Sequence, residues 1–122
     1  MRRIEKPWGH ELVWAHTARY VGKSLHIIAG RRLSLQFHRV KEESLFVRSG
    51  EVLVQLEDAA GVLQRHLLGP GATLHIPPGR QHRFEAITDC EMIEVSTPEL
   101  DDVVRIDDDY GRAPAGDEGG PV

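Results

Sequence analysis

The sequence has very little cysteine and no long run of apolar residues. Cys90 is the one cysteine among 122 residues, so a disulfide within the chain cannot stabilise the fold. We expect Cys90 to be a small buried apolar group. No apolar run approaches the roughly 18 residues that a membrane span requires. The first residues also lack the apolar stretch of a secretory signal. These absences predict a cytoplasmic protein that does not bind a membrane.

An excess of positive charge is also missing. The chain has 15 Lys and Arg residues against 19 Asp and Glu residues, a formal net charge of -4. Proteins that bind nucleic acid normally carry a net basic face, so we expect no nucleic-acid partner. The length suits one domain with one core. Residues 113–122 are acidic and rich in Gly and Pro. The sequence therefore predicts a single domain over residues 1–111 and a flexible tail over 112–122.

No stretch shows a sustained helical period of apolar residues. Short β-rich segments alternate instead with Gly and Pro turns, the pattern of an all-β barrel or sandwich. The connections are too short for helical crossovers, so the strands must be antiparallel. We expect strands at 21–28, 32–38, 44–48, 52–57, 64–68, 73–76, 82–86 and 91–95. Residues 8–14 and 101–106 are expected to add edge strands or a short helical turn.

The segment 32–38 has one polar and one apolar face if its side chains alternate. The polar face holds Ser34, Gln36 and His38. The apolar face holds Leu33, Leu35 and Phe37. This pattern predicts a barrel with a polar interior and an apolar outer wall. The apolar face is then either the contact of a homodimer or buried under the N-terminal segment.

Four residues form a candidate set of metal ligands. Gln36 and His38 project to the same side of one strand, Glu43 follows across a turn, and His82 begins a later strand. Two imidazoles, a carboxylate and an amide oxygen suit Zn, Mn, Fe, Co or Ni. No cysteine is present in the set, which argues against a closed structural zinc site. Four protein ligands leave room for water or substrate.

The spacing of these residues resembles the two sequence motifs of the cupins. The first motif runs from Gly30 through Gln36-Phe37-His38 and Glu43 to Gly50. The second runs from Gly71 through Pro77-Pro78-Gly79 and His82 to Ala86. Gln36 replaces the usual first histidine, and Ala86 replaces the usual asparagine. The resemblance implies an antiparallel double-stranded β-helix, also called a jelly-roll barrel, that holds one divalent metal ion with Gln36, His38, Glu43 and His82.

A narrower resemblance covers nearly the whole chain. Residues 6–9, 33–38, 76–79, 93–95 and 101–112 are similar to type II mannose-6-phosphate isomerase, a cupin that uses the Gln-x-His form of the first motif. Such cupins occur alone or fused behind a mannose-1-phosphate guanylyltransferase. The resemblance implies an aldose–ketose isomerase with a phosphorylated sugar as its small-molecule substrate and zinc as the first candidate metal.

The sequence also offers candidates for the catalytic base and for the residues that bind the substrate. The base that moves the proton is expected to be Lys41 or His75, unless a metal-bound hydroxide serves. Lys23, Arg80 and Arg83 are candidates for binding the sugar phosphate. Two rival functions stay open, because cupins host many chemistries. One is an Fe(II) dioxygenase, and the other is a metal-binding or sugar-binding cupin without turnover.

Overall fold

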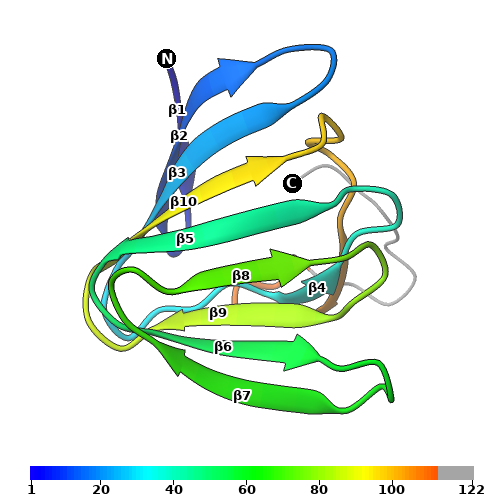
Figure 1. Ribbon diagram of the computed structural model, residues 1–122. Coiled ribbons are helices and arrows are strands. Elements are labelled where there is room, and N and C mark those ends of the chain that lie inside the picture. The colour runs from blue at the N-terminus through cyan, green and yellow to red at the C-terminus, as the bar shows by residue number, and fades with distance from the viewer. Residues whose placement is uncertain (113–122) are drawn as a thin grey trace.

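The computed structural model describes residues 1–112, which form two antiparallel β-sheets packed face to face (Figure 1). No helix occurs in this described part, so none there could cross a membrane. The strands are β1 (Arg2–Lys6), β2 (Gly9–His16), β3 (Val21–Ile27), β4 (Leu35–Phe37), β5 (Glu43–Ser49), β6 (Val52–Glu57), β7 (Leu63–Leu68), β8 (Thr73–Ile76), β9 (His82–Ala86), β10 (Cys90–Ser96) and β11 (Val104–Asp107).

One sheet has the order β1-β2-β3-β10-β5-β8, and the other has the order β11-β4-β9-β6-β7. Every neighbouring pair of strands is antiparallel. The predicted all-β fold is therefore confirmed. The two uncertain segments are the strands β2 and β11 and not helical turns. Strand β1 was not expected, because Ile4 is its one apolar residue and the segment shows no apolar alternation.

Glycine closes the hairpin between β5 and β6. Gly50 has a φ of 78°, a left-handed conformation that L side chains rarely adopt. A Cβ atom there would lie 2.2 Å from the carbonyl oxygen of Asp89. The Ser49-Gly50 turn therefore needs glycine both for its backbone angle and for the close approach of the neighbouring strand.

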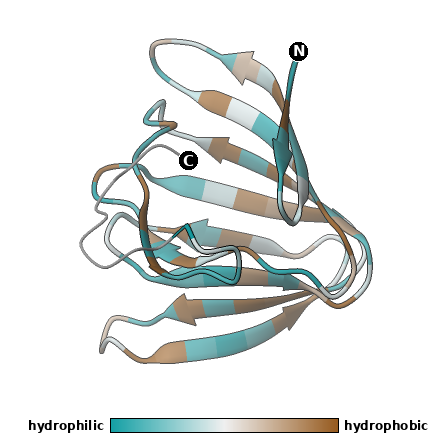
Figure 2. Cartoon of the chain, turned by 180° about the vertical axis from the view of Figure 1, so that it is seen from behind, coloured by the Kyte–Doolittle hydropathy of each residue, from teal (hydrophilic) through white to brown (hydrophobic). Residues whose placement is uncertain are grey.

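The hydrophobic core lies between the two sheets. Brown and teal alternate along the strands in Figure 2, as expected where one face of a strand is buried and the other meets water. Apolar side chains from both sheets meet inside: Leu25, Ile27, Leu45, Val47, Val52, Val54, Ile76, Phe84, Ala86, Cys90 and Met92. Cys90 is buried as expected. Burial raises the pKa of its thiol to about 11, which keeps it neutral.

A β-bulge before β4 changes the faces predicted for residues 32–38. Arg32 pairs with Glu85, whereas Gln36 pairs with His82, so four steps on one strand oppose three on the other. The extra residue turns Leu33 into the barrel, where it belongs to the core. Strict alternation was therefore wrong for Leu33, which is buried and unable to join an outer apolar face. Leu35 and Phe37 remain half-buried, and the homodimer stays a prediction.

The end of the described chain is fixed by an aspartate. The backbone N–H of Arg112 and its guanidinium both donate to the carboxylate of Asp108, at 2.7 to 3.0 Å. Arg112, the first residue of the predicted tail, is thus bound to the barrel. The rest of that tail, residues 113–122, lies outside the described residues.

Candidate metal centre

Three of the predicted ligands meet at one end of the barrel. His38 follows β4, Glu43 begins β5 and His82 begins β9. One ligand atom from each lies within 4.8 Å of the other two. The three residues are only 4%, 3% and 1% exposed. The period-two spacing and the turns of the sequence therefore bring two imidazoles and one carboxylate into a single buried site.

Backbone carbonyls orient both imidazoles. Nδ1 of His38 lies 2.5 Å from the carbonyl oxygen of Asp102, and Nδ1 of His82 lies 2.9 Å from that of Arg80. A carbonyl only accepts hydrogen bonds, so each Nδ1 carries a proton and each Nε2 is the ring nitrogen that can bind a metal. Both Nε2 atoms are buried: that of His82 has no hydrogen-bond partner within residues 1–112, and that of His38 faces the carboxylate of Glu43. Two buried ring nitrogens that face one carboxylate fit a metal ion.

The charge states at the site also fit a cation. Burial lowers the pKa of His82 to about 4, although Glu43 opposes the shift, so the imidazole is neutral near pH 7. Burial alone raises the pKa of Glu43, but the ammonium group of Lys41 and the contact with His38 outweigh it and hold that pKa well below its usual range. Nε2 of His38 lies 3.1 Å from Oε2 of Glu43. A contact this short between a ring nitrogen and a carboxylate oxygen needs a proton or a metal cation between the two atoms.

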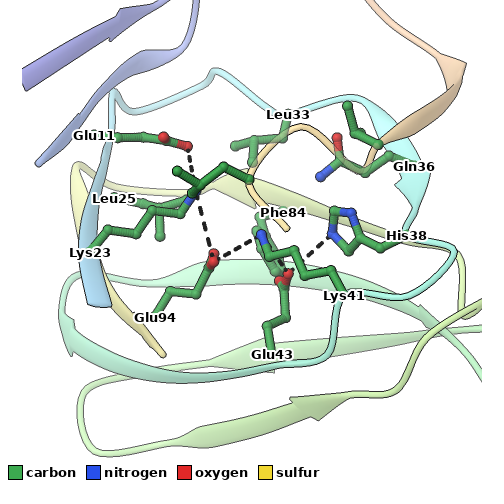
Figure 3. Close-up of a pocket in the computed structure, with 12 residues that line it drawn as sticks. Glu11, Lys23, Leu25, Leu33, Gln36, His38, Lys41, Glu43, Phe84 and Glu94 are labelled. Carbon is green, nitrogen blue, oxygen red and sulfur yellow. Dashed lines mark hydrogen bonds and ion pairs between the residues drawn. The ribbon is translucent and has the colours of Figure 1, made fainter. Parts of the chain in front are cut away.

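A line of alternating charges runs from this site across the barrel interior (Figure 3). Nζ of Lys41 lies 3.2 Å from Glu43 and 3.0 Å from Glu94. Nζ of Lys23 lies 3.8 Å from Glu94 and 3.2 Å from Glu11. Burial disfavours the charge on Lys41, but Glu94 and Glu43 outweigh burial and raise its pKa above the usual range. Lys41 therefore keeps its proton at neutral pH.

Asp102 holds the loop that carries Lys41. Its carboxylate accepts hydrogen bonds from the backbone N–H groups of Arg39, Val40 and Lys41 at 2.7 to 3.0 Å. Burial opposes ionisation, but these three donors lower the pKa of Asp102. The carbonyl of the same residue orients His38. One aspartate thus positions both a candidate ligand and the lysine beside it.

Gln36 and Lys23 also line the pocket that contains His38 and Glu43. Gln36 lies opposite His82 in the sheet, and its amide oxygen accepts a hydrogen bond from the Ser34 hydroxyl at 2.7 Å. Lys23 is buried between two carboxylates. The structure thus places five predicted site residues together: Lys23, Gln36, His38, Lys41 and Glu43. His82 joins them through the ligand triad.

Three other predicted site residues lie elsewhere, and none is among the described residues that line this pocket. His75 pairs with Ser44 in the sheet and faces outward. Its side chain is 56% exposed and contacts Glu42 at 2.6 Å. This position argues against His75 as the catalytic base.

The two arginines proposed to bind substrate contact the protein backbone instead. The guanidinium of Arg83 donates to the carbonyl oxygens of Leu33 and Asp107, because Arg83 follows the inward-facing His82 and projects from the opposite face. The guanidinium of Arg80 donates to the carbonyl oxygen of Glu57 at 3.4 Å. These contacts argue for structural roles.

Sequence reasoning missed Glu11, Glu94 and Asp102. Glu94 carried a usable signal, since it continues the inward face of β10 that begins with Cys90 and Met92. A charged residue at a position that alternation assigns to the core is a candidate for a buried site. Asp102 follows no strand pattern, because its role depends on a contact with the distant loop 39–41.

Comparison with solved structures identifies the fold. KdgF from Halomonas sp. superposes with a TM-score of 0.71 at 20% identity, over 80% of this chain and 88% of that chain. An RmlC-like cupin from Shewanella frigidimarina gives 0.69 at 18% identity, over 80% and 83% of the two chains. Oxalate decarboxylase from Bacillus subtilis gives 0.74 at 13% identity, over 86% of this chain and 30% of that chain. The fold is that of a cupin.

The sequence itself matches a narrower group. A model of the family described as mannose-6-phosphate isomerase C-terminal matches residues 1–108, so the chain belongs to that family. Mannose-1-phosphate guanylyltransferase ManC of Salmonella typhimurium is 33% identical over 91% of this chain and 23% of its own length. Alginate biosynthesis protein AlgA of Pseudomonas aeruginosa is 31% identical, over 89% and 23% of the two proteins. The chain thus spans about a quarter of these relatives.

Proposed function

We propose that this chain is a metal-dependent aldose–ketose isomerase that interconverts mannose 6-phosphate and fructose 6-phosphate. The metal centre is proposed from one observation: the buried ligand atoms of His38, Glu43 and His82 lie within 4.8 Å of one another. The family supports a sugar phosphate as substrate. The guanylyltransferase activity in the name of ManC belongs to a protein about four times as long. We do not assign it to this chain.

The sum of the formal charges in the pocket supports a cation at His38, Glu43 and His82. The lining includes three carboxylates, Glu11, Glu43 and Glu94, and two ammonium groups, Lys23 and Lys41. The sum is -1, which attracts a divalent ion and repels a phosphorylated sugar. A divalent ion held by His38, Glu43 and His82 brings the sum to +1. Zinc, the first candidate, would supply a Lewis acid that polarises the sugar carbonyl.

The reaction needs a group that moves a proton between neighbouring carbons. One proton leaves C2 and returns to C1, while another moves from the C2 oxygen to the C1 oxygen, so no oxidant or reductant is consumed. Lys41 is protonated and is therefore unsuited to accept the proton. Glu94 is a pocket carboxylate outside the triad, 3.0 Å from Lys41. We assign the proton transfer to Glu94 and the positioning of Glu94 and Glu43 to Lys41.

The test combines metal analysis with a coupled assay of hexose phosphates. Protein reconstituted with Zn, Mn, Co, Ni or Fe(II) should contain about one ion per chain, and His38→Ala and His82→Ala should lose most of it. Zinc-loaded protein should isomerise mannose 6-phosphate without consuming oxygen. Glu94→Gln should keep the metal but lower kcat by at least about 100-fold. Glu51→Gln, an exposed change of the same kind, is the matched control and should leave kcat unchanged.

Three outcomes contradict the proposal. If both histidine variants retain full metal, the site is wrong. If only Fe(II)-loaded protein turns over a substrate, and oxygen is consumed, the chain is a dioxygenase. If every metal form binds sugar phosphates but converts none of them, the chain is a binding module.

A further inference from the structure

A second pocket adjoins the metal pocket and has the opposite charge. The two pockets share Glu11, Leu33 and Gln36 in their walls. The second pocket adds three cations, from Lys6, Arg105 and Arg112, against the single carboxylate of Glu11. Its sum of charges is therefore +2. It remains positive if Asp108, which binds Arg112, is included. One pocket suits a divalent cation, and its neighbour suits an anion.

The three cations come from separate parts of the chain. Lys6 ends β1, and its ammonium group interacts electrostatically with the carboxylate of Glu11. Arg105 lies in β11 and is only 8% exposed. Arg112 is oriented by two hydrogen bonds from its guanidinium to the carboxylate of Asp108, both at 3.0 Å. Burial lowers the pKa of Lys6, which Glu11 opposes, and the charges of Lys23, Arg112 and Arg105 lower it further. An anion between these cations would relieve their mutual repulsion.

The sheet register relates this pocket to the metal centre. Arg105 of β11 lies opposite Gln36 of β4, which in turn lies opposite His82 of β9. Residues directly opposite one another project from the same face of a sheet. Neighbouring strands are about 4.8 Å apart, so Arg105 is offset from His82 by roughly 10 Å. An extended six-carbon sugar with a phosphate on its last carbon is of similar length.

We propose that the pocket lined by Lys6, Arg105 and Arg112 binds the phosphate group of a sugar phosphate whose other end reaches the triad. This inference rests on the proposed function for the identity of the sugar, but the binding of phosphate stands by itself. It replaces the sequence-based expectation that Arg80 and Arg83 bind the phosphate, because both guanidinium groups contact backbone carbonyls. Lys23 is not assigned to phosphate binding either, since Glu11 and Glu94 flank its ammonium group.

The experiment measures binding directly, by calorimetric titration of the zinc-loaded protein with inorganic phosphate, mannose 6-phosphate and unphosphorylated mannose. Lys6→Gln should weaken the binding of both phosphate compounds by about tenfold or more, because one charge-assisted hydrogen bond is lost. Arg112→Gln should also weaken both, and neither variant should alter the binding of mannose. Arg65→Gln removes an exposed cation on β7 and is the matched control, with unchanged affinity. Thermal unfolding of each variant checks that the fold is intact.

His38→Ala separates this pocket from direct binding of phosphate to the metal. If the pocket holds the phosphate, this variant should bind inorganic phosphate as the wild type does, whereas Lys6→Gln should bind it about tenfold or more weakly. The reverse pattern overturns the proposal, as does wild-type protein that binds neither phosphate compound at millimolar concentration. If Lys6→Gln and Arg65→Gln weaken phosphate binding equally, the binding reflects the net charge of the protein and not this pocket, and the proposal is overturned. Phosphate binding that depends on Lys6 in a protein without isomerase activity would refute the proposed function alone.

Discussion

The inward faces of four strands carry a charged or metal-ligating residue at one end of the barrel and an apolar residue two positions away. Both members of each pair point inward and are buried. The pairs, with the apolar residue second, are Lys23 and Leu25 in β3, Glu94 and Met92 in β10, Glu43 and Leu45 in β5, and His82 and Phe84 in β9. The barrel interior therefore consists of a charged layer and an apolar layer.

The two layers differ in what their burial contributes. Burying apolar side chains stabilises the fold by roughly 25 cal/mol for each Å² removed from water. Burying charges costs free energy, and ion pairs regain it only when every charge has a partner. A protein that needed stability alone would extend the apolar layer to both ends. The charged layer therefore indicates a site, and the comparison predicts different consequences of substitution in each layer.

The largest effect is expected from Lys41→Ala in the charged layer. Lys41 neutralises Glu43 and Glu94, both buried. Its loss leaves Glu43 without an ammonium partner and Glu94 with only Lys23, at 3.8 Å, and should lower the free energy of unfolding by about 3–5 kcal/mol. Chemical denaturation of metal-free protein measures the change. Arg65→Ala, at an exposed position, should change the same quantity by less than about 0.5 kcal/mol.

A second substitution tests whether the stability lost in Lys41→Ala comes from the uncompensated charge. Lys41→Ala combined with Glu94→Gln removes one of the two carboxylates and should be more stable than Lys41→Ala alone. A double variant as unstable as the single one would show that Lys41 stabilises the fold through packing of its alkyl chain and not through charge.

A somewhat smaller effect is expected from Met92→Ala in the apolar layer. Met92 is fully buried between Leu25 and Val47 of the neighbouring strands. The cavity should lower the free energy of unfolding by about 2–5 kcal/mol. The loss is closer to about 2 kcal/mol if the surrounding side chains move into the cavity. Metal content per folded chain, measured by elemental analysis, should stay at the wild-type value. Loss of metal from folded Met92→Ala would show that the layers are not independent.

Most strands, and the meeting of His38, Glu43 and His82, could be predicted because they follow from local rules. Glycine and proline turns delimited β5 to β9, and period-two alternation placed Gln36 and His38 on one face. The same rule, applied to β9, would have turned Arg83 away from the pocket, since it directly follows His82. Applied to β5 and β8, it would have separated His75 from the ligands.

The rest depended on contacts between distant residues. The bulge that turns Leu33 inward exists because the segment around β4 carries one residue more than its partner β9. Lys41 lies in a loop, where no alternation applies, and its place is set by Asp102. The second pocket joins Lys6 at one end of the chain to Arg112 at the other. Such contacts leave no pattern in a single sequence.

The smallest effect on stability is expected from His75→Ala. This variant tests whether a residue on the outside of the barrel takes part in the reaction. His75 directly precedes Ile76, whose side chain is fully buried, yet its own ring faces solvent and contacts Glu42. A surface pair of this kind contributes about 0–1 kcal/mol, so His75→Ala should change stability by no more than that. kcat for mannose 6-phosphate should equal the wild-type value, in contrast to Glu94→Gln. A collapse of kcat in His75→Ala with metal content unchanged would mean that the base lies outside the charged layer. The assignment of proton transfer to Glu94 would then be wrong, whereas the metal site and the phosphate pocket would be unaffected.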